Sequence, residues 1–92
     1  MRPDFKALRN IWILQVAEAL HIDLVRTGAG TYAMRDEREI TSLVIFEKTN
    51  TWKRFSGKES GGVSQGSPID LVMHIRECSF EQAIEFLTST FL

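Results

Sequence analysis

Residues 51–70 (TWKRFSGKESGGVSQGSPID) constrain the fold more than any other part of the sequence, because three kinds of structure are encoded in direct succession. The aromatic and basic run WKRF is typical of a strand, since aromatic side chains suit a pleated, half-buried surface. The next segment carries Gly57, Gly61, Gly62 and Gly66, and this glycine and serine content indicates a flexible loop. Ser67, Pro68 and Asp70 then have the properties of a cap, a first helical residue and an acidic first turn. The stretch therefore predicts strand, loop and helix, and a mixed α+β protein.

The segments on either side extend this α+β prediction. Residues 21–27 alternate between apolar and polar side chains, and Gly28-Ala29-Gly30 predicts a hairpin turn into a second strand at 31–35. The run SLVIF at 42–46 is the clearest strand, and a turn ending at Asn50 leads into 51–55. We therefore expect a small antiparallel sheet of three to four strands. Two amphipathic helices follow, one over 67–76 and one beginning at Ser79, where SFEQ is a capping-box pattern.

The amino-terminal segment predicts helix with an unusually wide apolar stripe. Asp4 is a suitable cap, and apolar side chains recur at helical spacing from Phe5 onward. The additional apolar residues between 11 and 20 widen the stripe beyond what one small core usually needs. Three explanations stay open: Asn10 divides the segment into two short helices, the rest of the fold wraps the stripe, or residues 5–20 form a partner surface such as a homodimer interface.

Length and cysteine content limit the protein class. The 92 residues, 43% of them hydrophobic, correspond to one domain, which we divide into a helical segment at 1–20, a sheet at 21–56, a loop at 57–66 and two helices at 67–90. A single cysteine, Cys78, excludes an internal disulfide and a cysteine-based zinc cage. No apolar run is long enough to cross a bilayer, and the amino terminus lacks the layout of a signal peptide. We therefore expect a cytoplasmic protein that does not associate with membranes.

The sequence offers no constellation typical of an enzyme. The glycine loop is not a phosphate-binding P-loop, because it lacks the Gly-Lys-Ser/Thr ending and Lys58 comes too early. Asp70, His74 and Cys78 share one face of a continuous helix, but three ligands at a helix end are a weak metal signal. No two carboxylates stand out as an acid and base pair. We expect no catalytic activity, no metal and no cofactor.

Charge distribution is compatible with nucleic-acid binding despite a net charge of -1. Most basic residues fall in the middle of the chain, where a sheet can gather them on one face. In this interpretation Lys53, Arg54 and Lys58 contact phosphates, Trp52 or Phe55 stacks on a base, and the helix start at Ser67 accepts an anion. Strand alternation places Trp52 and Arg54 on one face and Lys53 and Phe55 on the other, so only one of the two rings can be exposed. The simpler interpretation, in which both rings belong to the core, stays open.

The order of these segments resembles a known family. A hairpin after a short helix, the strand SLVIF, the strand WKRF, the glycine loop and the ending IDLVMHI with SFEQAIEFL resemble the zinc-binding domain of bacterial DNA primases. The similarity is greatest to diverged relatives in primase-like proteins of plasmids and conjugative elements, and it covers about residues 15–90. It implies a zinc-ribbon-like sheet followed by two helices.

The sequence departs from this family at the zinc ligands. The first ligand region holds Arg35, Asp36, Glu37 and Arg38, and the second reads KRFSG, so neither supplies cysteine or histidine. A structural zinc site needs four such ligands. The resemblance therefore implies a metal-free version of the ribbon, stabilised by its apolar core. Arg35 or Arg38 is expected to pair with Asp36 or Glu37 across the former site.

The resemblance implies an accessory domain that binds single-stranded template DNA for a primase-like replication protein of a mobile element. A catalytic primase domain would then lie in a longer parent chain or in a partner. The alternative is a protein-interaction or dimerisation module that kept the fold and lost DNA binding. The residues predicted to contact nucleic acid are Arg35, Arg38, Trp52, Lys53, Arg54, Lys58 and Ser67.

Overall fold

The computed structural model describes residues 4–36, 39–55 and 64–92, and it confirms the predicted α+β class. The elements along the chain are α1 (Phe5–Arg9), α2 (Ile13–Ala19), β1 (Asp23–Gly28), β2 (Thr31–Asp36), β3 (Glu39–Phe46), β4 (Thr51–Arg54), β5 (Gln65–Gly66), α3 (Pro68–Arg76) and α4 (Phe80–Phe91). The sheet has one strand more than the three to four expected. Neighbouring strands in the sequence are neighbours in the sheet, in the order β1-β2-β3-β4-β5, and every pair is antiparallel.

Two tight turns join β1 to β2 and β3 to β4 and set the register of these two strand pairs. The turn between β1 and β2 contains Gly30, whose φ of 75° is a conformation that glycine adopts without steric cost. The turn between β3 and β4 ends at Asn50, whose φ of 58° is tolerated by asparagine better than by most residues. Both turns lie where the sequence predicts them, since their conformations depend on local residue types.

The additional strand, β5, lies at the end of the predicted loop. Its two residues pair with β4, Gln65 opposite Lys53 and Gly66 opposite Trp52. Gly66 has a φ of 138°, and a Cβ atom on it would collide with the carboxylate of Asp70. Glycine at this position therefore allows the chain to pair with β4 and enter α3 at once. The sequence predicts a loop at these positions, because two residues are too few to show the alternation of a strand.

The two carboxyl-terminal helices start as predicted. In α3 the Ser67 side chain accepts from the backbone of the first turn, and the Asp70 carboxylate accepts from the Ser67 N–H at 2.8 Å. In α4 the side chain of Ser79 accepts from the Gln82 N–H at 3.1 Å and the Gln82 side chain accepts from the Ser79 N–H at 3.0 Å. These reciprocal bonds satisfy N–H groups that have no partner within a helix.

The amino-terminal segment is two short helices, and Asn50 joins them to the sheet. Helix α1 ends at the Asn10 cap, as one of the open explanations anticipates. Helix α2 has no side-chain cap of its own, and the Oδ1 atom of Asn50 accepts from the Ile13 N–H at 2.8 Å instead. The Nδ2 atom of Asn50 donates to the carbonyls of Arg9 at 3.2 Å and Ile11 at 2.9 Å. One amide therefore satisfies the backbone between two helices from a turn far away in the sequence.

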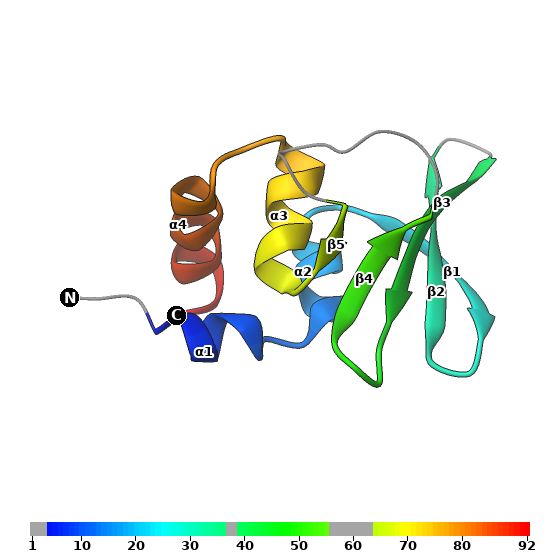
Figure 1. Cartoon of the computed structure of the whole chain (residues 1–92), viewed down its shortest axis with the longest axis horizontal. Coiled ribbons are helices and arrows are strands. Elements are labelled where there is room, and N and C mark those ends of the chain that lie inside the picture. Colours follow the sequence, from blue (N-terminus) through cyan, green and yellow to red (C-terminus); the bar gives the residue numbers. More distant parts are fainter. Residues whose placement is uncertain (1–3, 37–38, 56–63) are drawn as a thin grey trace.

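All described helices lie on one side of the sheet (Figure 1). Helix α3 packs on β4 and β5, whereas α4 packs against α3 and α1 as a further layer, away from the strands. The core lies between the sheet and these helices, and five of its buried side chains come from the amino-terminal stripe: Leu8, Ile13, Val16, Ala17 and Leu20. Most of that stripe is therefore wrapped by the fold, while Phe5 and Trp12 stay exposed. No helix in the described ranges has the length and apolar character needed to cross a membrane.

Replacing Asn50 with glycine tests the role of this amide. Glycine keeps the positive φ but removes all three hydrogen bonds, so the Ile13 N–H and two carbonyls lose their partner. We expect Asn50→Gly to lower the free energy of unfolding by about 2 kcal/mol in urea denaturation.

The matched control is Asn10→Gly, because the side chain of Asn10 is exposed and accepts or donates no hydrogen bond among the described residues. It makes the same chemical change at an exposed helix end. Equal losses in the two variants would show that the three hydrogen bonds of the Asn50 side chain do not stabilise the fold.

Candidate nucleic-acid interface

Strand β4 sends the predicted contact residues to opposite faces of the sheet. Trp52 lies opposite Ile45 of β3 and Arg54 lies opposite Leu43, and both of these partners are buried in the core. Lys53 lies opposite Val44 and points the other way. Phe55 follows β4 on the Lys53 side. The predicted separation of the two aromatic residues is therefore confirmed, and Phe55 is the exposed one.

Trp52 is a core residue, which corrects its assignment as a base-stacking residue. Its side chain is 1% exposed, and its Nε1 atom donates to the carbonyl of Ser67 at 3.0 Å. The indole ring packs against the ring of His74, with the centroids 4.8 Å apart. Because both faces of the indole lie inside the protein, no nucleic-acid base can stack on it.

The sheet surface turned away from the helices is called the outer face here. Cross-strand pairing places Val25, Ala33, Val44 and Lys53 in one row across β1 to β4, and Phe46 and Phe55 share that face. None of these side chains belongs to the buried cluster between sheet and helices, and no described helix covers them (Figure 1). The outer face is thus an apolar sheet surface with few charges.

Phe55, Phe46 and Lys53 form the most chemically distinctive part of the outer face. Phe55 is 60% exposed, and its ring meets the ring of Phe46 edge-on with the centroids 6.4 Å apart. The Nζ atom of Lys53 lies 5.1 Å from the centroid of the Phe55 ring, within the range of a cation–π contact. An exposed ring can stack on an unpaired base, and an adjacent ammonium can contact a phosphate.

Arg35 also lies towards the outer face, but its charge is compensated. Its Nε atom donates to the Asp23 carboxylate on the neighbouring strand at 2.9 Å. The expected partner, Asp36, is on the wrong face of β2, because successive side chains of a strand point in opposite directions. Asp23 lies 12 residues before Arg35 on another strand, so the sequence alone does not indicate this pair. Arg38 and Glu37 lie outside the described residues.

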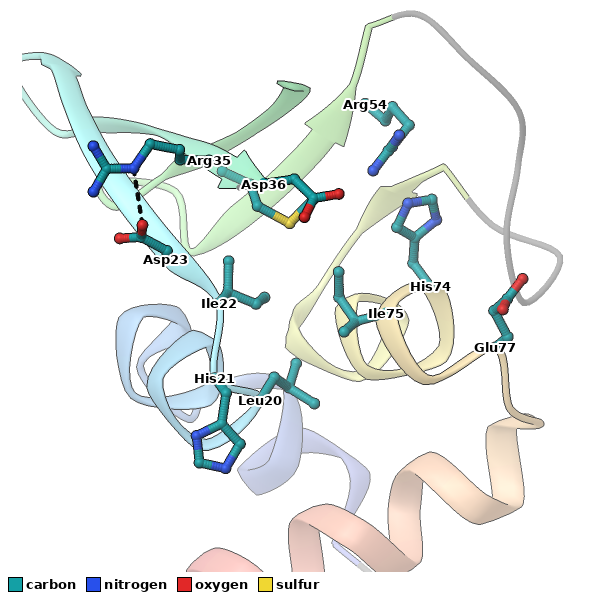
Figure 2. A pocket seen from close by; sticks show the side chains of 11 residues that line it. Leu20, His21, Ile22, Asp23, Arg35, Asp36, Arg54, His74, Ile75 and Glu77 are labelled. Carbon is teal, nitrogen blue, oxygen red and sulfur yellow. Dashed lines mark hydrogen bonds and ion pairs between the residues drawn. The ribbon is translucent and has the colours of Figure 1, made fainter. Parts of the chain in front are cut away.

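Arg54 lies on the helix side of the sheet, apart from Lys53. Figure 2 shows its side chain beside His74, above a groove between the sheet and α3. The two cations predicted to act together therefore face different surfaces. Lys58, the third predicted phosphate contact, lies outside the described residues.

The helix start at Ser67 is occupied by its own side chains. The Ser67 N–H donates to Asp70, and the Ile69 N–H donates to the Ser67 Oγ atom at 3.2 Å. Pro68 has no N–H. The Asp70 carboxylate also places a negative charge where an anion would bind, so the assignment of Ser67 as an anion site is wrong.

Phe46 is the contact candidate that sequence reasoning missed. In the run SLVIF every position from Leu43 to Phe46 is apolar, so alternation cannot tell which side faces the core. Phe46 lies two residues after Val44, so these two side chains share one face of β3. The sequence does not show which face this is, and the burial of Trp52 opposite Ile45 decides that Val44 and Phe46 face outward.

Metal ligands do not gather in the part of the chain that the structure describes. No three side chains of histidine, cysteine, aspartate or glutamate come close enough there to hold an ion. Helix α3 ends at Arg76 with Glu77 in the left-handed conformation, so Cys78 leaves the helical face that carries Asp70 and His74.

Intrinsic fluorescence tests the burial of Trp52. The Trp12→Phe variant keeps only Trp52, which is 1% exposed, and the Trp52→Phe variant keeps only Trp12, which is 47% exposed. We expect the Trp12→Phe protein to emit at shorter wavelength and to be quenched less by acrylamide, because the core excludes water and quencher. Circular dichroism checks that both variants are folded. Equal quenching of the two would contradict a buried Trp52.

Comparison with known proteins identifies no family. No protein-family model matches the sequence, and no curated protein matches it significantly.

Proposed function

We propose that this domain binds single-stranded DNA through the outer face of its sheet. The observation that carries the proposal is the exposed Phe55 ring, supported by Phe46 and contacted by the Lys53 ammonium, on a sheet face that no described helix covers. Exposure of an aromatic ring to water is energetically unfavourable, so an exposed ring often marks a binding surface. A ring beside a cation suits a surface that binds bases and phosphates.

A single strand fits this surface better than a duplex. The faces of bases are accessible only where the strand is unpaired, and stacking on an aromatic side chain contributes about 1–3 kcal/mol per base. A duplex would bind through phosphates, which requires many cations. Among the described outer-face residues, Lys53 and the compensated Arg35 are the only cations, so stacking has to supply most of the affinity.

The resemblance to the zinc-binding domain of bacterial primases supports a role in DNA replication. We propose an accessory domain of a primase-like protein of a mobile element, with no catalytic activity of its own. The catalytic domain would be supplied by a longer parent chain or by a partner. The assignment to a primase-like protein is supported by the order of the strands SLVIF and WKRF, the glycine loop and the two helical segments along the sequence.

Substitution of Phe55 tests the stacking surface. We expect Phe55→Ala to weaken binding of a fluorescently labelled oligothymidylate by about tenfold, because one base loses its stacking partner. Fluorescence anisotropy measures the affinity. The matched control is Phe80→Ala, because Phe80 is also exposed but lies at the start of α4, away from the sheet. If both variants bind like the unmodified protein, the outer face is not the binding surface.

Substitution of Lys53 tests the phosphate contact. For single strands the logarithm of the binding constant falls with the logarithm of salt concentration by about 0.7 per phosphate contact. We therefore expect Lys53→Gln to reduce this slope by about 0.7, with Lys6→Gln on the exposed surface of α1 as the control of equal charge. An unchanged slope would exclude Lys53 from phosphate binding.

Sedimentation of the free protein distinguishes DNA binding from the alternative function as a protein-interaction module, because an interaction module would form a dimer and leave DNA unbound.

A further inference from the structure

A groove lies on the helix side of the sheet, where the ends of β2 and β4 meet α3. Its volume is about 460 Å³, which falls in the range of small-molecule sites. Apolar side chains form its floor, including Ile22, Met34 and Ile75. Polar groups stand above this floor: Arg54, His74 and Asp36 (Figure 2). This combination of an apolar floor with a few convergent polar groups is typical of a binding site.

Arg54 presents an unused hydrogen-bond donor at this groove. Its Nε atom is buried and has no acceptor among the described residues. A buried donor without a partner costs about 1–3 kcal/mol, so such groups are uncommon unless a ligand satisfies them. The backbone of Arg54 is held in place, because its N–H donates to the Ser64 carbonyl at 2.8 Å. The guanidinium is therefore a donor on a supported strand end.

Asp36 presents an acceptor to the same space. Its carboxylate extends from the end of β2 into the groove, on the side where Arg54 and His74 lie (Figure 2). The two groups do not pair, since the ion pair between Arg35 and Asp23 is the only one within the described residues. The groove is thus lined by a fork of donors and a pair of acceptors.

The charges of the groove disfavour a phosphate as its ligand. The carboxylates of Asp36 and Glu77 lie on its walls, and the pairing of Arg35 with Asp23 adds no free charge. A phosphate would gain one guanidinium and be repelled by two carboxylates. A flat, uncharged ligand that carries acceptors on one edge and donors on the next would satisfy both Arg54 and Asp36.

We infer that this groove binds an unstacked guanine base. Guanine presents O6 and N7 as paired acceptors, which a guanidinium fork matches, and arginine is the commonest partner of this edge. Its N1–H and N2–H groups are paired donors that one carboxylate accepts. The apolar floor formed by Ile22, Met34 and Ile75 takes the place of a neighbouring base.

This inference rests on the proposed function, which brings a single strand to the end of β4. Arg54 and Phe55 are consecutive residues that point to opposite faces of the sheet. A strand that stacks one base on Phe55 therefore passes the edge where a following base can enter the groove. Outer face and groove would then bind neighbouring nucleotides, the first without sequence preference and the second with preference for guanine.

Anisotropy with two labelled oligomers tests the groove. One is a short oligothymidylate, and the other has the same length with a single central guanine. We expect the unmodified protein to bind the guanine oligomer about tenfold more tightly, in line with the discrimination of one bidentate base contact. Asp36→Asn and Arg54→Lys should remove this preference, so that each variant binds the two oligomers with equal affinity. Glu77→Gln is the matched control, because it removes a charge from the same groove wall at a residue that is not proposed to pair with the base.

A spectroscopic measurement on the unmodified protein tests the same contact and does not depend on the folding of the Arg54→Lys variant. The Nε–H signal of Arg54 in a ¹H–¹⁵N spectrum of the unmodified protein should shift with the guanine oligomer and not with oligothymidylate. Equal affinity for the two oligomers, with no shift, would overturn the groove and leave the outer face as the binding surface. An equal gain from a single adenine or cytosine would overturn the assignment to guanine. Absence of binding to any oligomer would overturn the proposed function. In that case the guanine site is supported if guanosine monophosphate alone shifts the Arg54 signal, and it is overturned if guanosine monophosphate causes no shift.

Discussion

Burial of Trp52 is the interaction on which the rest of the structure depends. The indole fills the space between β4 and α3, packs on His74, and ties the entry of α3 to the sheet through its bond to the Ser67 carbonyl. Loss of a buried tryptophan side chain typically costs about 3–5 kcal/mol, a large share of the stability of so small a domain. Because strand residues alternate, this one inward ring also decides that Lys53 and Phe55 face outward. Core packing and the candidate surface are thus two consequences of the same side-chain placement.

The one-sided arrangement of the layers follows from the small size of the domain. Helix α3 covers the sheet, whereas α4 and α1 pack against α3. The helices therefore form successive layers on one side of the sheet, and no described helix covers the opposite face. Asn50 holds this arrangement at the other end of the sheet, where its side chain satisfies the backbone between α1 and α2. This half-buried amide is costly to remove, because three backbone groups would lose their hydrogen-bond partner at once. The uncovered outer face is therefore a property of the packing and not of a single exposed residue.

The end of β4 is where the two proposed binding surfaces meet. Phe55 and Lys53 face the outer side, and Arg54 faces the groove with Asp36 and His74. The two carboxylates of the groove and the compensated Arg35 mean that recognition would depend on stacking and hydrogen bonds more than on the attraction of phosphates. This fits a protein whose net charge is -1, for which a strongly electrostatic mode of DNA binding has little basis.

Features that depend on neighbouring residues could be predicted from the sequence. The hairpin turn at Gly30, the cap at Ser67, the capping box at Ser79 and the alternation along β4 were predicted, and the break at Asn10 was one of three explanations left open, because turn conformations, caps and side-chain periodicity are local. Only the tertiary structure decided which face of β4 is buried, that Arg35 pairs with Asp23, and that Asn50 bonds the backbone of Ile13 across 37 residues. The same holds for the helix start at Ser67, where the N–H groups expected to be free donate to the side chains of Asp70 and Ser67. These outcomes depend on which distant side chains meet when the core closes, and local residue preferences carry no information about those encounters.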